Sequence, residues 1–242
     1  MQQYIYGKNP VTEWLRAGLP VEKMWMTREA ASKTEQDLKK TIPRHVSIQY
    51  VNRVQLSKIV KHEQHQGIAL AVQLPDYADL GTVAKRAKEW GEAPLVAILD
   101  HVQDPHNLGA ILRSADGAGI HGVIIPKDQA VGLTPAAFKA SAGAAAHVPL
   151  VRVTNLVRTI QELKEEGYWF VGTHQDGKQS YTDIDYKGPM GIVMGSEGKG
   201  IRPLVTKHCD YLVSIPMRGK VNSLNVSIAS ALLFFEARRQ RS

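Results

Sequence analysis

The sequence predicts an α/β protein with a parallel sheet in its C-terminal two-thirds and a smaller α/β module before it. From Ala93 onward, apolar runs rich in β-branched residues alternate with helical patterns, which is typical of a parallel sheet with helices on both faces. A stretch that opens with Pro75, holds one short polar helix and ends at a glycine separates this region from shorter elements upstream. Since proline and glycine mark connections, we expect a small domain at 1–74, a linker at 75–92 and a large domain at 93–242.

The expected elements follow from the period of the apolar residues. In the small domain they are helices at 11–17, 32–40 and 53–60, and strands at 23–26, 46–50 and 68–74. In the large domain we expect strands at 95–99, 123–125, 148–153, 168–172, 192–194 and 211–215. Helices are expected at 107–118, 135–144, 156–166, 202–208 and 225–239.

Composition excludes several classes of protein. The chain is 43% hydrophobic and 22% charged, as in ordinary globular proteins. Its longest apolar runs, at 95–99 and 229–235, are far shorter than the roughly 20 residues of a membrane-spanning helix. Residues 1–10 lack the apolar core of a signal peptide. The single cysteine, Cys209, forms neither an internal disulfide nor a metal site. These features predict a cytoplasmic protein without metal or membrane attachment.

The positive charge is concentrated near the N-terminus. Residues 1–75 hold 11 Lys+Arg against 6 Asp+Glu, which is +5 of the formal net charge of +7. A module that binds the phosphates of a nucleic acid has this balance. A solvated basic surface explains the charge equally well.

Three segments resemble known ligand-binding motifs but lack the residue order or spacing that the binding mechanism of each motif requires. The glycines at 117–122 fit the dinucleotide fingerprint, but a helix precedes them and a strand follows, which is the reverse of what the fingerprint needs. His62 and His65 are three residues apart, whereas a zinc-protease helix needs four. Lys199 is followed by Gly200 and not by the Ser or Thr of a P-loop. A nucleotide-dependent oxidoreductase is therefore disfavoured.

Three other segments follow expected strands, where ligands bind in open α/β sheets. In the first, Asn107 lies near a helix start and Arg113 follows it by six residues. Six residues turn a helix by roughly 600°, so the two side chains lie about 120° apart and can flank one substrate. A capped helix with a surface arginine explains the same pattern.

In the second segment, a strand runs into three glycines around Glu197, at 195–200. Glycines let the backbone approach a ligand closely, and the carboxylate favours a cationic or polar ligand, such as a sulfonium group or a ribose hydroxyl, over a phosphate. A tight turn in which Glu197 caps the next helix is the alternative. In the third segment, Ser223 and Asn225 precede the last helix, and both are also good N-cap residues.

Taken together and in this order, the segments resemble the three motifs of the SpoU/TrmH family of RNA 2′-O-ribose methyltransferases. The matching residues are Asn-x-Gly-x-x-x-Arg at 107–113, Gly-Ser-Glu-Gly-x-Gly at 195–200 and Ile-Pro-Met…Ser-Leu-Asn-Val-Ser at 215–227. The small domain, with His65-Gln-Gly-Ile68 near its end, resembles the ribosomal-protein-like substrate-binding domain of the RlmB-type subgroup.

This resemblance implies a SPOUT methyltransferase domain with a C-terminal trefoil knot, a homodimer and S-adenosyl-L-methionine as cofactor. The apolar last helix is a candidate for the dimer interface, although an ordinary core helix fits equally well. The resemblance implies cofactor contacts at Met194, Gly195, Gly200, Ile215, Met217, Leu224 and Val226.

The resemblance also makes Arg113 the central catalytic residue, surrounded by Asn107, Glu197, Ser223 and Asn225. A guanidinium with a pKa above about 12 resists acting as a base. We therefore expect Arg113 to bind the adjacent phosphate and to stabilise the developing oxyanion. Candidate contacts to RNA phosphates in the small domain are Lys8, Arg16, Arg28, Arg44, Arg53 and Lys61.

The implied function is methylation of a ribose 2′-hydroxyl, with a guanosine of large-subunit (23S) ribosomal RNA as the expected target. A transfer RNA ribose methyltransferase is the main alternative, but a separate N-terminal domain favours ribosomal RNA. A non-catalytic RNA-binding protein of the same fold is the second alternative. The intact polar residues of all three motifs argue against it.

Overall fold

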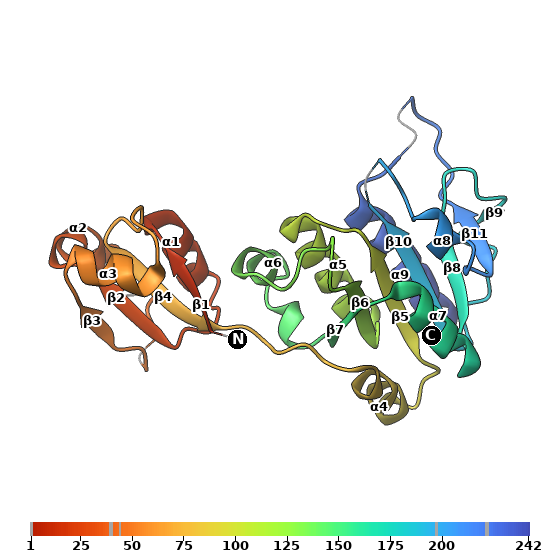
Figure 1. The fold of residues 1–242 in the computed structure, drawn as a ribbon, viewed down its shortest axis with the longest axis horizontal. Helices are drawn as coiled ribbons and strands as arrows, with labels where there is room; N and C mark the ends of the chain where they lie inside the picture. Colours follow the sequence, from red (N-terminus) through yellow and green to blue (C-terminus); the bar gives the residue numbers. More distant parts are fainter. Residues whose placement is uncertain (1, 39–40, 44, 197, 221–222) are drawn as a thin grey trace. The chain divides into compact units, whose positions relative to one another are not determined.

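The chain divides into two compact units, Met1–Asp76 and Tyr77–Ser242 (Figure 1). The computed structural model describes residues 2–38, 41–43, 45–196, 198–220 and 223–242. Within these residues, no helix is both long enough and apolar enough to cross a membrane.

The first unit is a four-stranded sheet with strand order β1-β4-β2-β3. β4 is antiparallel to β1 and to β2, whereas β2 and β3 are parallel. β1 was not expected, because only Ile5 of its five residues is buried and the strand therefore lacks an apolar run. The elements are β1 (Gln2–Tyr6), α1 (Lys8–Arg16), β2 (Lys23–Met26), α2 (Arg28–Leu38), β3 (Ile48–Tyr50), α3 (Arg53–Val60) and β4 (Ile68–Gln73).

Three helices of this unit begin at the same edge of its sheet. β1, β2 and β3 all run in one direction, and a helix follows each of them. The first residues of these helices are Lys8, Arg28 and Arg53, and all three are exposed. Arg16 is the last residue of α1 and therefore lies at that helix's other end.

Hydrogen bonds from His65 and Gln66 hold the start of α1 and part of α3 at this edge of the sheet. Buried His65 accepts a hydrogen bond on Nδ1 from the amide of Gly67, so its Nε2 carries the proton that faces Ser57 Oγ at 3.0 Å. The side-chain oxygen of Gln66 accepts a bond of 2.8 Å from the amide of Lys8. Gln66 thereby replaces the capping side chain that Gly7, the N-cap of α1, lacks.

The described part of the second unit forms a seven-stranded sheet in the order β7-β6-β5-β10-β8-β11-β9. Every pairing in it is parallel, which confirms the prediction of a parallel sheet. The strands are β5 (Leu95–Asp100), β6 (Gly122–Pro126), β7 (Leu150–Val153), β8 (Trp169–Thr173), β9 (Gln179–Ser180), β10 (Met190–Gly195) and β11 (Tyr211–Ser214).

Helices cover both faces of this sheet (Figure 1). α5 and α9 contact each other on one side, next to β6 and β10, whereas residues of α4, α7 and α8 pack with Val96, Ile124 and Val193 on the other. The helices are α4 (Leu80–Trp90), α5 (Pro105–Ala118), α6 (Pro135–Ala140), α7 (Leu156–Glu165), α8 (Pro203–Thr206) and α9 (Val226–Arg241), with a 3₁₀ turn at Ala144–Ala146.

β10 lies between β5 and β8 although β8 and β9 precede it in the chain. It pairs in register with both neighbours, Gly195 opposite Asp100 of β5 and Met190 opposite Trp169 of β8. The chain therefore returns to the centre of the sheet near its end. The trefoil knot expected for this region stays a prediction.

The segment 75–92, expected as a linker, contains α4. The side chain of Asp79 caps this helix by accepting from the amide of Thr82, and Gly91 ends it with a positive φ of 67°. Val83 is buried and packs in the core of the second unit. From Tyr77 onward the segment accordingly groups with that unit.

Gly109 allows α5 and α6 to approach closely. A Cβ at this position would lie 2.5 Å from the carbonyl oxygen of Ala137 and 2.5 Å from Cβ of Ala140. Both contacts are far shorter than van der Waals distances. The glycine of the first motif is therefore required for helix packing.

We expect Gly109→Ala to lower the free energy of unfolding by about 1–3 kcal/mol, as overpacking of a filled core does. Gly188→Ala is the matched control, because nothing lies within 4 Å of a Cβ there. Urea unfolding of both variants measures the difference. Equal stability of the two would contradict the packing role of Gly109.

Candidate active site

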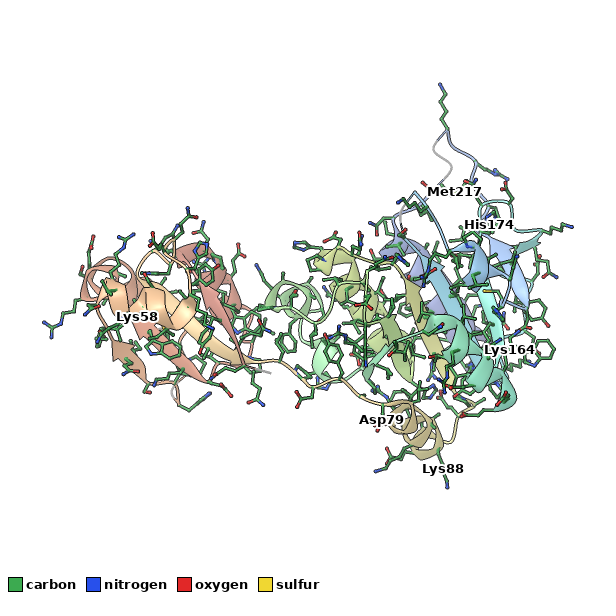
Figure 2. All side chains as sticks on the ribbon, viewed as in Figure 1. Lys58, Asp79, Lys88, Lys164, His174 and Met217 are labelled. Carbon is green, nitrogen blue, oxygen red and sulfur yellow. The ribbon has the colours of Figure 1, made fainter. Side chains whose placement is uncertain are left out.

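A cavity of about 290 Å³ opens at the carboxyl ends of β8, β10 and β11. Ligands of parallel α/β sheets bind at this edge. His174 follows β8 and Met217 follows β11, and both line the cavity (Figure 2). Its other lining residues are Thr173, Gln175, Met194, Gly195, Ser196, Gly198, Lys199, Gly200, Val213, Ile215, Ser223, Leu224, Val226 and Ala229.

All seven residues expected to contact the cofactor line this one cavity. They come from three separate parts of the chain: the end of β10, the residues after β11, and the start of α9. Ser223, expected near the reacting groups, lines it as well. The seven are Met194, Gly195, Gly200, Ile215, Met217, Leu224 and Val226.

The wall after β10 is built from main chain. Ser196 and Gly200 exchange two backbone hydrogen bonds, of 3.2 and 2.9 Å, and Gly200 has a positive φ of 65°. A Cβ at Gly195 would lie only 2.0 Å from the carbonyl carbon of Gly200. Only glycine at 195 therefore permits this turn. The geometry of the turn accounts for this glycine, and no phosphate-binding role is needed to explain it.

The first and third motifs meet directly. Asn225 Nδ2 donates a hydrogen bond of 2.9 Å to Asn107 Oδ1, across 118 residues of sequence. Asn225 Oδ1 accepts from the amide of Ser227 and so caps α9. Capping and contact with the first motif are thus combined in one side chain. Both asparagines are half-buried beside Leu224 and Val226 of the cavity wall.

Arg113 is exposed on α5, almost two turns beyond Asn107, and is not among the residues that line the cavity. Within the described part of the chain, no side-chain hydrogen bond or ion pair engages it. Its guanidinium is therefore available to a ligand. Glu197 lies outside the described residues.

Sequence reasoning missed Thr173, His174 and Gln175, which line the cavity after β8. The signal was present, because the rule that pointed to the ends of β10 and β11 applies to β8 as well. Among the described residues, no group of three or more His, Cys, Asp or Glu side chains is arranged to hold a metal.

Cys209 lies next to the sheet and outside the cavity. Its sulfur contacts the carbonyl oxygen of Val205 at 3.6 Å. Burial, with a further contribution from Asp210, raises the pKa of this thiol to about 12. Since the thiolate is the reactive form, Cys209 is not a nucleophile at neutral pH.

Comparison with known proteins agrees with this geometry. Residues 94–235 match the SpoU rRNA Methylase family, and residues 4–78 match the family of RNA 2′-O ribose methyltransferase substrate-binding domains. A protein of Bacillus subtilis strain 168, assigned to the TrmH family of tRNA/rRNA methyltransferases, is 44% identical over 240 residues, which are 99% of this chain and 96% of the relative.

Two crystal structures match nearly the whole length of this chain. The SpoU methyltransferase AviRb of Streptomyces viridochromogenes, in complex with the cofactor AdoMet, superposes with a TM-score of 0.68 and 27% identity, over 99% of this chain and 90% of AviRb. An AdoMet-bound rRNA methyltransferase of Sinorhizobium meliloti has a TM-score of 0.64 and 28% identity, over 98% of this chain and 87% of that one.

The fold, the cavity and these matches define an RNA methyltransferase with a separate substrate-binding domain. The chain belongs to the SpoU rRNA methylase family. The family expected from the three motifs and the prediction that the protein is a methyltransferase are thereby confirmed.

We expect iodoacetamide to alkylate Cys209 about 10²–10³-fold more slowly in the native protein than in urea at pH 8, because its raised pKa leaves little thiolate. Mass spectrometry over time measures both rates, and the denatured protein is the control. Rapid labelling of a protein with an unchanged circular dichroism spectrum would contradict the burial of this thiol.

Proposed function

We propose that the protein transfers the methyl group of S-adenosyl-L-methionine to a ribose 2′-hydroxyl of RNA. The observation that carries this proposal is the convergence of the second and third motifs on one cavity, with Asn107 of the first motif bonded to Asn225 at its wall. AviRb and the Sinorhizobium meliloti enzyme, which have both units in common with this chain, were each solved with AdoMet.

A guanosine of large-subunit (23S) ribosomal RNA is the proposed target, in the cytoplasm where ribosomes assemble. The enzyme from Sinorhizobium meliloti, which matches both units, is described as an rRNA methyltransferase. A transfer RNA substrate is the second candidate, since the Bacillus subtilis relative is assigned to a family of both tRNA and rRNA enzymes.

The cavity residues fit the cofactor chemically. Gly195 and Leu224 are proposed to present main-chain groups to its polar parts, and Met194, Met217 and Val226 to present apolar surface. Gly200, whose amide already donates to Ser196, lets the ligand approach closely. When bound, S-adenosylmethionine supplies a methyl group made electrophilic by the sulfonium. The residues of the chain hold the two reactants in line, which contributes up to about 7–11 kcal/mol in ideal cases.

Arg113 is proposed to bind the phosphate next to the reacting ribose and to stabilise the oxyanion that develops on the 2′-oxygen. Its exposure and its lack of protein partners in the described chain suit contact with RNA. Asn107, Asn225 and Ser223 are proposed to orient the substrate beside it, with Glu197 from the glycine-rich segment.

We propose a homodimer in which α9 contributes to the interface. One side of this helix packs into the unit through Leu233 and Phe234. Ile228, Leu232 and Phe235 remain 54%, 37% and 51% exposed, and their spacing of four and three residues places them on one stripe of the helix. Paired subunits would remove this apolar stripe from water. A C-terminal trefoil knot, as the family resemblance implies, is part of the same proposal.

The first unit is proposed to bind the RNA through the edge at which its helices begin. Lys8, Arg28 and Arg53 all lie there, and neutralisation of phosphates by such cations dominates affinity for nucleic acids. Lys61 ends α3 but directly precedes His62, whose ring stacks on Tyr6 at the end of β1 with 5.0 Å between centroids, so Lys61 is a further candidate. Arg16 lies at the other end of α1 and is assigned no RNA contact, and Arg44 lies outside the described residues.

We expect Arg113→Lys to lower kcat by about 10²–10³-fold at every pH, because an ammonium does not reproduce the bidentate contact of a guanidinium. Methyl transfer from labelled S-adenosylmethionine to ribosomal RNA, taken from cells that lack the gene, measures the rate. Mapping of the 2′-O-methyl positions identifies the target. Near-normal activity with a pH limb shifted toward the pKa of lysine would instead identify residue 113 as the base.

Neutralisation of the helix-start edge should weaken RNA binding. We expect Lys8→Gln, Arg28→Gln and Arg53→Gln together to reduce the slope of log Kd against log salt by about 2–3, since each phosphate contact contributes roughly 0.7–0.9. Arg16→Gln is the control and should leave the slope unchanged. Filter binding of ribosomal RNA over a salt series measures it, and an equal effect of Arg16→Gln would refute the proposed edge.

A further inference from the structure

An ion pair between a buried carboxylate and a half-exposed arginine lies next to the glycine-rich segment. Asp100, the last residue of β5, has a fully buried side chain. Its Oδ2 accepts a hydrogen bond of 2.8 Å from the backbone amide of Arg202, and its Oδ1 accepts one of 2.8 Å from Arg202 Nε. His101 Nδ1 donates a further bond of 2.7 Å to the same Oδ1.

Asp100 lies next to both ends of the glycine-rich segment. At one end, Gly195 is opposite Asp100 in the β5–β10 ladder. At the other end, the carboxylate binds Arg202 through both its main chain and its side chain. Between these two points lie Ser196 and Lys199, which line the cavity. Asp100 thus connects the end of β10, where the segment begins, with Arg202, which follows the end of the segment.

The contact between Asp100 and Arg202 is better suited to positioning the glycine-rich segment than to stabilising the fold. The Asp100 carboxylate is fully buried whereas the Arg202 side chain is 47% exposed, so loss of the arginine would leave a buried charge with fewer partners. Its hydrogen bonds fix direction as well as distance. Arg202 lies next to Ile201, which is buried in the core of the unit, so the bond to Asp100 determines where the segment returns to the sheet.

We propose that Asp100 and Arg202 are positioning residues that hold the Gly195–Gly200 segment in the conformation that walls the cofactor cavity. Neither residue is among those that line the cavity. The proposal rests on the proposed function only for the identity of the ligand.

The test compares Asp100→Asn, Arg202→Gln and the double variant by calorimetric titration with S-adenosylmethionine. We expect each single variant to weaken Kd about tenfold, and the double variant to be little weaker than Asp100→Asn alone, because the bond that Arg202→Gln removes is one of those that Asp100 accepts. At saturating cofactor, kcat should change less than roughly threefold. Arg158→Gln is the control, since it removes an arginine from a surface ion pair with Glu162 on α7.

Hydrogen exchange without cofactor gives an independent measurement. The amide of Gly200, which donates to the carbonyl oxygen of Ser196, should exchange about tenfold faster in both single variants while amides of β5 and β6 keep their rates. Unchanged exchange and unchanged Kd, or faster exchange throughout the sheet, would overturn the proposal. If Asp100→Asn does not fold, Arg202→Gln alone decides. A wild-type protein that binds no S-adenosylmethionine would refute the proposed function, whereas the exchange result would still decide the positioning role.

Discussion

The placement of β10 between β5 and β8 is the constraint on which the site depends. Since β10 is parallel to both neighbours, the segments after β5, β8 and β10 all leave the sheet at one edge. The return of α9 against α5 then brings Asn225 to Asn107. Strand order and the packing of α9 on α5 together make neighbours of residues that are more than a hundred positions apart. Each motif therefore contributes a part of the site, and none of them forms it alone.

Two glycines of the motifs have different physical reasons. Gly109 lets two helices touch, because a methyl group there would collide with α6. Gly195 lets the chain turn back upon itself, because a methyl group there would collide with Gly200. The first glycine permits the contact between α5 and α6, and the second lies in the cavity wall. Glycine is thus required for helix packing at position 109 and for loop geometry at position 195.

Local patterns in the sequence predicted the buried strands and long helices of the second unit well, because their apolar periods are strong. β1 escaped prediction because pairing with β4, and not an apolar run, holds Gln2–Tyr6 in the sheet. α4 was assigned to a linker although Val83 and Ala87 give it an apolar side. The central position of β10 is a long-range property that no local period encodes. The role of Asp100 likewise depends on a partner 102 residues away.

The single, buried thiol of Cys209 has a practical consequence for spectroscopy. Cysteines introduced at exposed positions would react much faster than Cys209, which is partly buried and whose thiol pKa is raised to about 12. Lys58 of the first unit and Lys88 of the second are both exposed and lie on helices (Figure 2). Dyes or spin labels attached at these two positions can report the distance between the units during RNA binding, without replacement of the native cysteine.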